Sequence, residues 1–405
     1  MQKFPNYESS SVFPNNIFFT GVVEDRKDPL KLGRVRVRIH GIHTEDKINI
    51  PTETLPWASV IHNNSASVSG IGESSVPFLE GSWVVGFFQD GDARQKPILL
   101  GSFFGIPEEA ADIQTGFYDP RTPEELSAYP RKPEEEPSAR NYPKVDTTFG
   151  NKLHENDLNR LARNEFVAGL EEESKSSIIE KKNSSRDKNV PTALGFGGVW
   201  DEPNSRYDAV YPFNAVTESE SGHVFEVDDT PGAERLHEYH RSGTFTEIAP
   251  DGSKVQRIVR NNYEIVLQDN FVHIQGVSNI TTNGNFNLLS SGSIHLESKN
   301  NLALHVHSNV DIRVDGNMVL NVKGGDLDIN VESGDLVVNA LNVSANISGN
   351  LVSSVGGDTE IHTSGDLDLK TDGNVNHVVG GDYNLFVTGK IDMRGNPITL
   401  NPDKS

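Results

Sequence analysis

The last third of the chain is built on an eight-residue repeat, and this repeat limits the possible folds more than any other feature. Glycine recurs at every eighth position in two series, with Asn300 and Ser308 filling two open positions of the first. The glycines are Gly276, Gly284, Gly292, Gly316 and Gly324, followed by Gly349, Gly357, Gly365, Gly373, Gly381 and Gly389. The two series are out of step by one residue, which predicts an irregular turn around residues 325–334.

The residues between the glycines alternate in polarity. The second, fourth and sixth residues after each glycine position are mostly apolar, and those between them are mostly Asn, Asp, Ser, Lys or His. This period of two is typical of a strand with one dry and one wet face. Because glycine and asparagine tolerate the positive φ of a sharp corner, each octad predicts a short strand followed by a corner. The predicted core residues are Leu288, Leu296, Leu304, Ile312, Leu320, Ile361, Leu369 and Leu385.

Closing such strands around a core requires several chains. One chain offers too few inward side chains per turn, whereas three chains about a common axis bury the dry face and leave no free strand edge. A single-chain parallel β-helix is the alternative, but its coils are usually longer than these. We therefore predict an all-β needle at residues 267–395, a trimeric intertwined triple-stranded β-helix, with residues 396–405 as its tip.

One inward position of the needle is polar. His377 stands fourth in its octad, where the compared octads carry aliphatic residues apart from Ser353. In a trimer three imidazoles would meet on the axis, and buried polar groups require partners. His377 is therefore a candidate axial site, either for a shared water or anion rather than a metal ion, or for stacked imidazoles. No other cofactor is expected.

Residues 17–107 are expected to form a small closed barrel of the OB type, after an N-terminal arm at residues 1–16. Short apolar runs follow one another between turn signals, which suits a closed barrel better than an open sheet. In one run, Val35, Val37 and Ile39 alternate with arginines. These arginines, Arg34, Arg36 and Arg38, are candidates for docking on acidic groups of a partner protein, with oligonucleotide or sugar binding as the alternative.

The alternation is lost between residues 108 and 206. Proline, glutamate, lysine and serine dominate, and such a composition buries too little apolar area to offset chain entropy. We expect an extended linker here, with one short helix at residues 155–171, whose apolar residues roughly share a face. Order returns in a β-rich neck at residues 207–266, where strand-like runs flank a Pro-Asp-Gly turn.

Charge and composition disfavour several classes of function. The formal net charge is −22, which opposes binding to nucleic acid or anionic lipid through a basic surface. The chain contains no cysteine, so disulfides and thiol chemistry are excluded. We see neither a signal peptide nor a long apolar run, and therefore expect assembly in the cytoplasm.

Two long stretches carry a resemblance to a known family. The first runs GVVEDRKDPLKLGRVRVRIHGIH (21–43) and continues with EGSWVVGFF (80–88) and PILLGSFFGI (97–106). The second runs TESESGHVFEVDDTPGAERLHEYHRSGTFTEIAPDGSKVQRIVRNNYEIV (217–266). They resemble the OB domain and the segment before the β-helix of the baseplate central spike proteins of T-even-type phages. The resemblance implies a homotrimer in the tail baseplate of the virion. Its barrel would dock on a hub protein, and its needle would carry a small tip protein and pierce the host envelope.

One part of the family's pattern is missing. The T-even proteins carry a lysozyme domain between barrel and needle, where this chain has the charged, proline-rich stretch. A muramidase of that kind needs two carboxylates across a cleft, held by a sizeable domain. Glu165 lies in a run that resembles a catalytic helix, but too little apolar sequence follows it to build a cleft. We therefore predict a structural spike without catalytic residues. A spike with cell-wall hydrolase activity, or one from a related secretion or injection system, is the alternative.

Two histidine pairs have spacings found among metal ligands, His40 with His43 and His237 with His240. Neither pair has a third acidic or imidazole ligand nearby in a matching pattern. Hydrogen bonding is the expected role of both pairs, and no metal site is predicted.

Overall fold

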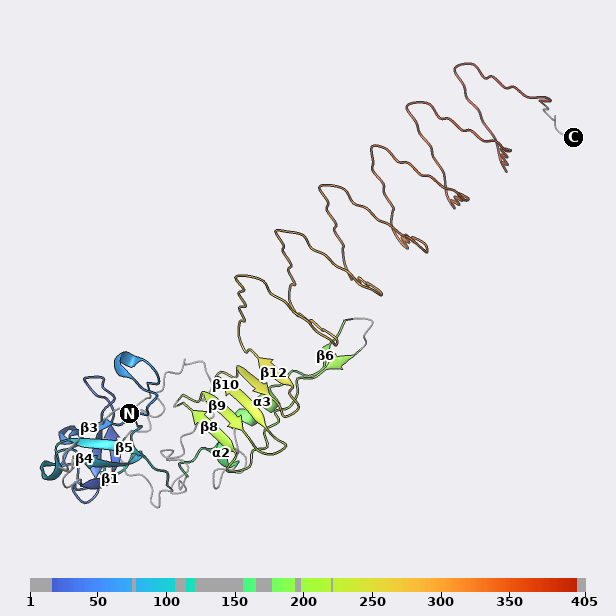
Figure 1. The fold of residues 1–405 in the computed structure, drawn as a ribbon. Helices are drawn as coiled ribbons and strands as arrows, with labels where there is room; N and C mark the ends of the chain where they lie inside the picture. The colour runs from blue at the N-terminus through green and yellow to red at the C-terminus, as the bar shows by residue number, and fades with distance from the viewer. Residues whose placement is uncertain are drawn as a thin grey trace, which may run out of the picture. The chain divides into compact units, whose positions relative to one another are not determined.

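The computed structural model describes residues 17–74, 78–105, 114–120, 156–164, 177–193, 198–219 and 221–398. The chain divides into two compact units, Met1–Asn309 and Val310–Ser405. The first unit contains all of the strands and helices in the described residues, and Figure 1 shows them in chain order.

The N-terminal strands form a closed five-stranded barrel. The strands are β1 (Phe18–Asp25), β2 (Val35–Ile39), β3 (Trp57–Val60), β4 (Trp83–Phe88) and β5 (Pro97–Ser102). Their order around the barrel is β1-β2-β3-β5-β4, and only the β3–β5 pair is parallel. Three short 3₁₀ turns lie in the connections, at Thr52–Thr54, Val68–Gly70 and Gly91–Ala93. The predicted barrel is confirmed.

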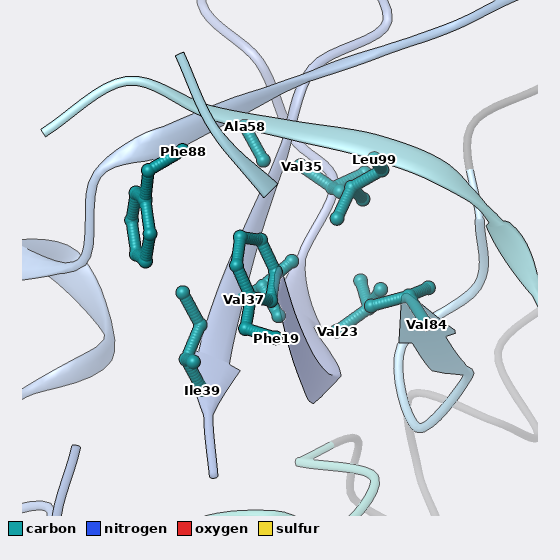
Figure 2. Packing of buried hydrophobic residues seen from close by; sticks show 9 residues of the cluster. All are labelled: Phe19, Val23, Val35, Val37, Ile39, Ala58, Val84, Phe88 and Leu99. Atoms are coloured by element: carbon teal, nitrogen blue, oxygen red, sulfur yellow. The ribbon is translucent and has the colours of Figure 1, made fainter. Parts of the chain in front are cut away.

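The barrel core follows from the alternation in its strands. Val35, Val37 and Ile39 are fully buried, as their period of two predicts. Figure 2 shows the nine buried residues of this core, which are Phe19, Val23, Val35, Val37, Ile39, Ala58, Val84, Phe88 and Leu99. Burying a side chain of this size contributes about 1.5–3 kcal/mol. The barrel therefore has a hydrophobic core made by its own residues.

The neck is a five-stranded antiparallel sheet in which each strand pairs with the next one in sequence. The strands are β8 (Asn214–Glu218), β9 (Val224–Asp228), β10 (Arg235–Tyr239), β11 (Phe245–Ile248) and β12 (Lys254–Arg257). The predicted Pro-Asp-Gly turn joins the last two strands, with Gly252 at φ 82°. The sheet ends at Arg257, before the end of the neck that the sequence placed at residue 266.

The predicted linker is not entirely a linker. Its described residues include α2 (Arg160–Arg163), α3 (Ser177–Ser184) and the short strands β6 (Val190–Pro191) and β7 (Val199–Trp200). Leu161 of α2 is buried in a cluster with Val224, Tyr239 and Phe245 of the neck sheet, and Ile178 and Ile179 of α3 pack against this cluster. Residues of α2 and α3 before residue 206 therefore pack on the sheet, whereas β6 and β7 form a separate two-stranded sheet.

Only part of the predicted helix at residues 155–171 lies among the described residues. There, α2 begins after Asn159, whose side chain accepts a hydrogen bond from the Leu161 backbone, and ends at Asn164 in a left-handed conformation. Glu165 and the remainder of the expected helix lie outside the described residues. No helix in the described parts of the chain is both long and apolar enough to cross a membrane.

Residues 258–398, all of them described, form neither helix nor strand, and every residue from 259 onward is exposed. Figure 1 shows extended segments separated by bends. From 267 to 324 and from 348 to 397 the bends recur at intervals of eight residues, at or beside the glycine positions of the repeat. An irregular stretch of bends at 323–325, 332–334 and 341 separates these two series.

The corner glycines do not have the backbone conformation that we expected of them. Among the described glycines after residue 258, only Gly325 (φ 90°) and Gly334 (φ 117°) adopt a positive φ, and both lie in the irregular stretch. A Cβ atom added at Gly284 or Gly316 would meet no other atom within 4 Å. Within one chain, therefore, nothing requires glycine at these two regular corners.

Candidate assembly surfaces

The predicted needle core is exposed in the single chain. At the fourth octad positions, Ile312 is 66% exposed and Leu369 is 82% exposed. The other predicted core residues are equally uncovered, namely Leu288, Leu296, Leu304, Leu320, Ile361 and Leu385. His377 is exposed too. A long apolar stripe in contact with water marks a surface for association. We call the second, fourth and sixth positions of the octads the octad stripe.

Polar residues within the octad stripe bond to their own corners. At the sixth position, the hydroxyls of Thr282 and Thr363 donate to the carbonyl oxygens of Gly284 (3.3 Å) and Gly365 (3.1 Å). Ser290 instead accepts a hydrogen bond from the backbone N–H of Gly292 at 3.2 Å. Because these hydroxyls have partners within the chain, they could enter an apolar interface without a large desolvation cost.

The intervening outward positions carry the charges of this region. Residues 267–398 contain fifteen acidic and six basic side chains. The Arg313 guanidinium lies 2.8 Å from the Asp311 carboxylate, and the Lys390 ammonium lies 3.1 Å from Asp392. Exposed pairs of this kind add at most about 1 kcal/mol. The apolar and charged side chains thus follow two separate sets of positions.

The neck sheet has one covered and one open face, and the open face carries a row of apolar side chains. Register places Ala215 beside Val227, Val227 beside Leu236, and Leu236 beside Ile248, so these four residues form a row across β8–β11. Leu236 is 47% exposed. Phe225, on the same face of β9, is 52% exposed. The sequence predicted strand-like runs in the neck, but only the pairing of the strands places these side chains side by side.

The three candidate docking arginines are bound within the barrel itself. Arg34 donates to both carboxylate oxygens of Asp28, with the shorter contact at 2.7 Å. This contact holds the pKa of Asp28 well below its usual range. Arg36 donates to the Thr52 carbonyl at 2.9 Å. These arginines do not form the free basic face that the alternation suggested.

Arg38 is a core residue of the barrel, so its predicted place on a docking surface is corrected. Its side chain is completely buried and donates to both carboxylate oxygens of Glu24, at 2.6 and 3.1 Å. Two further hydrogen bonds reach the carbonyls of Thr44 and Ile50, in the loop after β2. That loop covers Arg38, which the alternation alone placed in solvent.

Apolar side chains mark a different surface of the barrel. Strands β4 and β5 contain no charged residue. Trp83 packs edge-on against Phe103, with ring centroids 5.8 Å apart, and both rings remain partly exposed. Phe18 and Leu100 of the neighbouring strands are also exposed. Strands that are apolar on both faces are typical of sheets covered on both sides.

The histidine pairs do not converge on a metal site. His43 accepts a hydrogen bond from the Ile39 backbone at 2.9 Å, and His40 stacks on Phe117 with centroids 4.3 Å apart. His240 bonds to Ser242 at 2.8 Å, whereas His237 is buried under α3. Within the described residues, no group of three or more potential metal ligands was found.

The strand order of the barrel gives its fold class, and comparison with known proteins gives the proteins to which the chain is similar. A strand order of β1-β2-β3-β5-β4 in a closed barrel is the OB fold. The sequence model of the family described as "Gp5 N-terminal OB domain" matches residues 39–150.

Two relatives agree with this match. "Protein Gp5" of Vibrio phage KVP40 is 41% identical over 292 residues, which are 66% of this chain and 63% of that protein. "Pre-baseplate central spike protein Gp5" of Enterobacteria phage T4 is 47% identical over 125 residues, 29% of this chain and 21% of that protein. The chain is similar to the Gp5 baseplate proteins of these phages, which agrees with the resemblance seen in the sequence. It spans less than two thirds of the length of either relative.

Proposed function

We propose that this chain is the structural central spike of a contractile phage tail baseplate. It acts as a homotrimer whose barrel docks on a hub and whose needle carries a tip protein and pierces the host envelope. Its location in the baseplate of the virion is inferred from its similarity to the Gp5 proteins. The observation that carries the proposal is the octad stripe, in which apolar residues repeat at fixed positions and remain uncovered in one chain.

Trimerisation explains three features of this chain together. Association of three copies would bury the octad stripe and leave the charged positions outward. The open face of the neck sheet, with Leu236 and Phe225, precedes the first octads and supplies a second apolar surface. Nothing within one chain requires glycine at the regular corners. A neighbouring chain that lies close to a corner would require it, because a Cβ atom would then have less room. In such a needle, His377 would face the axis and hold a water or an anion.

The barrel is the end suited to a heterologous partner. Its residues 17–105 contain ten acidic and nine basic side chains, so it is nearly neutral in a chain of charge −22. The exposed surface around Trp83, Phe103 and Leu100 offers the apolar contact area that stable interfaces use. Arg34 and Arg36 stay candidates only at the rim of such an interface, since their charges are already paired.

The measurement that tests this function is the mass of the purified protein in solution. A trimer is expected, and light scattering that gives the 44.5 kDa of one chain would overturn the proposal. The hydrolase alternative needs a separate assay, because Glu165 lies outside the described residues. We expect no clearing of peptidoglycan in a turbidity assay. Clearing that is lost in the Glu165→Gln variant would establish an enzyme on a needle instead.

A further inference from the structure

The covered face of the neck sheet holds a buried network of ionisable side chains. Its members are Glu226 of β9, Arg235 and His237 of β10, Glu247 of β11 and Lys182 of α3, each at most 5% exposed. Arg235 lies 2.6 Å from Glu226 and 3.2 Å from Glu247, and Lys182 lies 2.5 Å from Glu247. Two carboxylates therefore face two cations, and the charges balance if His237 is neutral.

The contacts of His237 fix its protonation state. Its Nδ1 atom lies 2.7 Å from a carboxylate oxygen of Glu226, which can only accept, so Nδ1 carries the proton. Its Nε2 atom lies 3.1 Å from the Lys182 ammonium, which can only donate, so Nε2 must accept. Burial lowers the pKa of His237, and the hydrogen bond to Glu226 offsets this only in part. The neutral Nδ1–H form is the one that fits.

We propose that Lys182 and His237 form an acid-sensitive latch that holds α3 on the neck sheet. A proton added to Nε2 would remove its lone pair and place an imidazolium 3.1 Å from the Lys182 ammonium. The groups that face His237 are Lys182 from α3, Glu226 from β9, and Arg235 and the Tyr239 ring from its own strand. From β11, the Phe245 ring lies beside it and Glu247 is bound to the same Lys182. Because only Lys182 comes from α3, repulsion acts on the helix rather than on the sheet.

The direction of the pH effect follows from this geometry. When α3 is released, His237 regains an ordinary pKa near 6.5, above its value under the helix. The released state then binds the extra proton, so α3 is held most firmly above pH 6.5 and loosens as the pH falls below it. Glu226 and Glu247 do not act in this window. Although burial opposes ionisation, the bond from His237 lowers the pKa of Glu226, and Lys182 lowers that of Glu247 to about 2.

The latch is tested by hydrogen exchange in the full-length protein at pH 7.5, 6.5 and 5.5, corrected for intrinsic exchange rates. Opening of residues 177–184 should increase by about tenfold across this range, since one proton gives at most tenfold per pH unit. Amides of β9 and β10 should not change. His237→Gln should flatten the response, whereas the exposed control His240→Gln should keep it. A flat response in the natural sequence, or an unchanged slope in His237→Gln, would overturn the proposal.

A second variant, Lys182→Met, tests the latch even if His237→Gln does not fold. Lys182→Met keeps an apolar stem beside the Phe245 ring, from which the Lys182 nitrogen lies 4.0 Å, and removes the cation. The sheet retains its own Arg235 pairs with both carboxylates. We expect α3 to open more readily at every pH and to respond less to acid, because burial still lowers the pKa of His237 but the repulsion from Lys182 is gone. A Lys182→Met protein that responds to acid as strongly as the natural sequence would show that repulsion from Lys182 does not open the latch.

Discussion

The barrel and the octad region use the same alternation of apolar and polar residues with opposite results. In the barrel, Val35 and Val37 are covered by four other strands of the same chain. In the octad region, Ile312 is 66% exposed, although its neighbours alternate just as regularly. The difference lies in where the covering atoms come from. The barrel closes on itself, whereas an octad segment bends away and leaves its side chains uncovered by its own chain.

The largest expected effect separates inward from outward octad positions. Ile312→Asp would place three carboxylates near a water-poor axis, each costing several kcal/mol unless protonated or paired. We expect this variant to lose the SDS-resistant trimer in unboiled samples. The matched control is Arg313→Asp, which alters only an exposed ion pair with Asp311 and should keep the trimer. If both variants lost the trimer equally, the alternation would not distinguish inside from outside.

The second expected effect concerns where the self-covered part of the chain begins. Sequence alone placed the start of the neck at residue 207, but Leu161 and Lys182 are buried against the sheet. A fragment of residues 207–405 lacks both, which uncovers Tyr239 and Phe245. We expect limited proteolysis to cut the neck of this fragment at least severalfold faster than that of a fragment of residues 156–405. Equal resistance would restore the boundary at 207.

Sequence reasoning was reliable wherever one strand's own pattern decides burial. It identified Val35, Val37 and Ile39 as core residues, and the turn at Gly252. It failed where burial depends on a segment distant in sequence. Arg38 is covered by the loop that follows its strand, and it pairs with Glu24, fourteen residues earlier. Periodicity within one strand contains no information about either contact.

The same limit explains the errors around the neck. The segment with α3 has the composition of a linker, and only the acceptors on the sheet make its Lys182 a buried residue. The covered face of the sheet carries Glu226, Arg235 and His237, so an apolar pattern would not reveal it as the interior. Among the candidate sites, the residues of the octad stripe were all identified from the sequence. The apolar row through Leu236 could be identified only from the register of four paired strands.

The third expected effect tests whether Arg38 belongs to the barrel core or to a docking surface. Arg38→Met leaves the buried Glu24 carboxylate without its cation, which should cost about 3–5 kcal/mol. Unfolding can be followed in the full chain by the fluorescence of Trp57 and Trp83 in the barrel. Arg34→Met is the control and should cost less, because the Arg34 side chain is 22% exposed and Asp28 keeps the hydrogen bonds from the backbone of Leu30 and Leu32. If Arg38→Met did not change the stability, Arg38 would again be a candidate for the docking surface.

The smallest expected effect distinguishes corners set by the backbone of one chain from corners set by a neighbouring chain. Gly325 has φ 90°, a conformation that costs an L-residue about 1–2 kcal/mol, so Gly325→Ala should destabilise the needle by about that amount per chain. Gly316 has an ordinary φ, and an added Cβ would meet nothing within 4 Å of its own chain. If only contacts within one chain determined the effect, Gly316→Ala would be neutral or slightly stabilising, because alanine restricts the unfolded chain. We expect a measurable loss instead, smaller than that of Gly325→Ala, since a corner packed against a second chain leaves less room. Thermal unfolding of the two trimers side by side provides the measurement, and a neutral Gly316→Ala would show that the octad glycines are not needed for contact between chains.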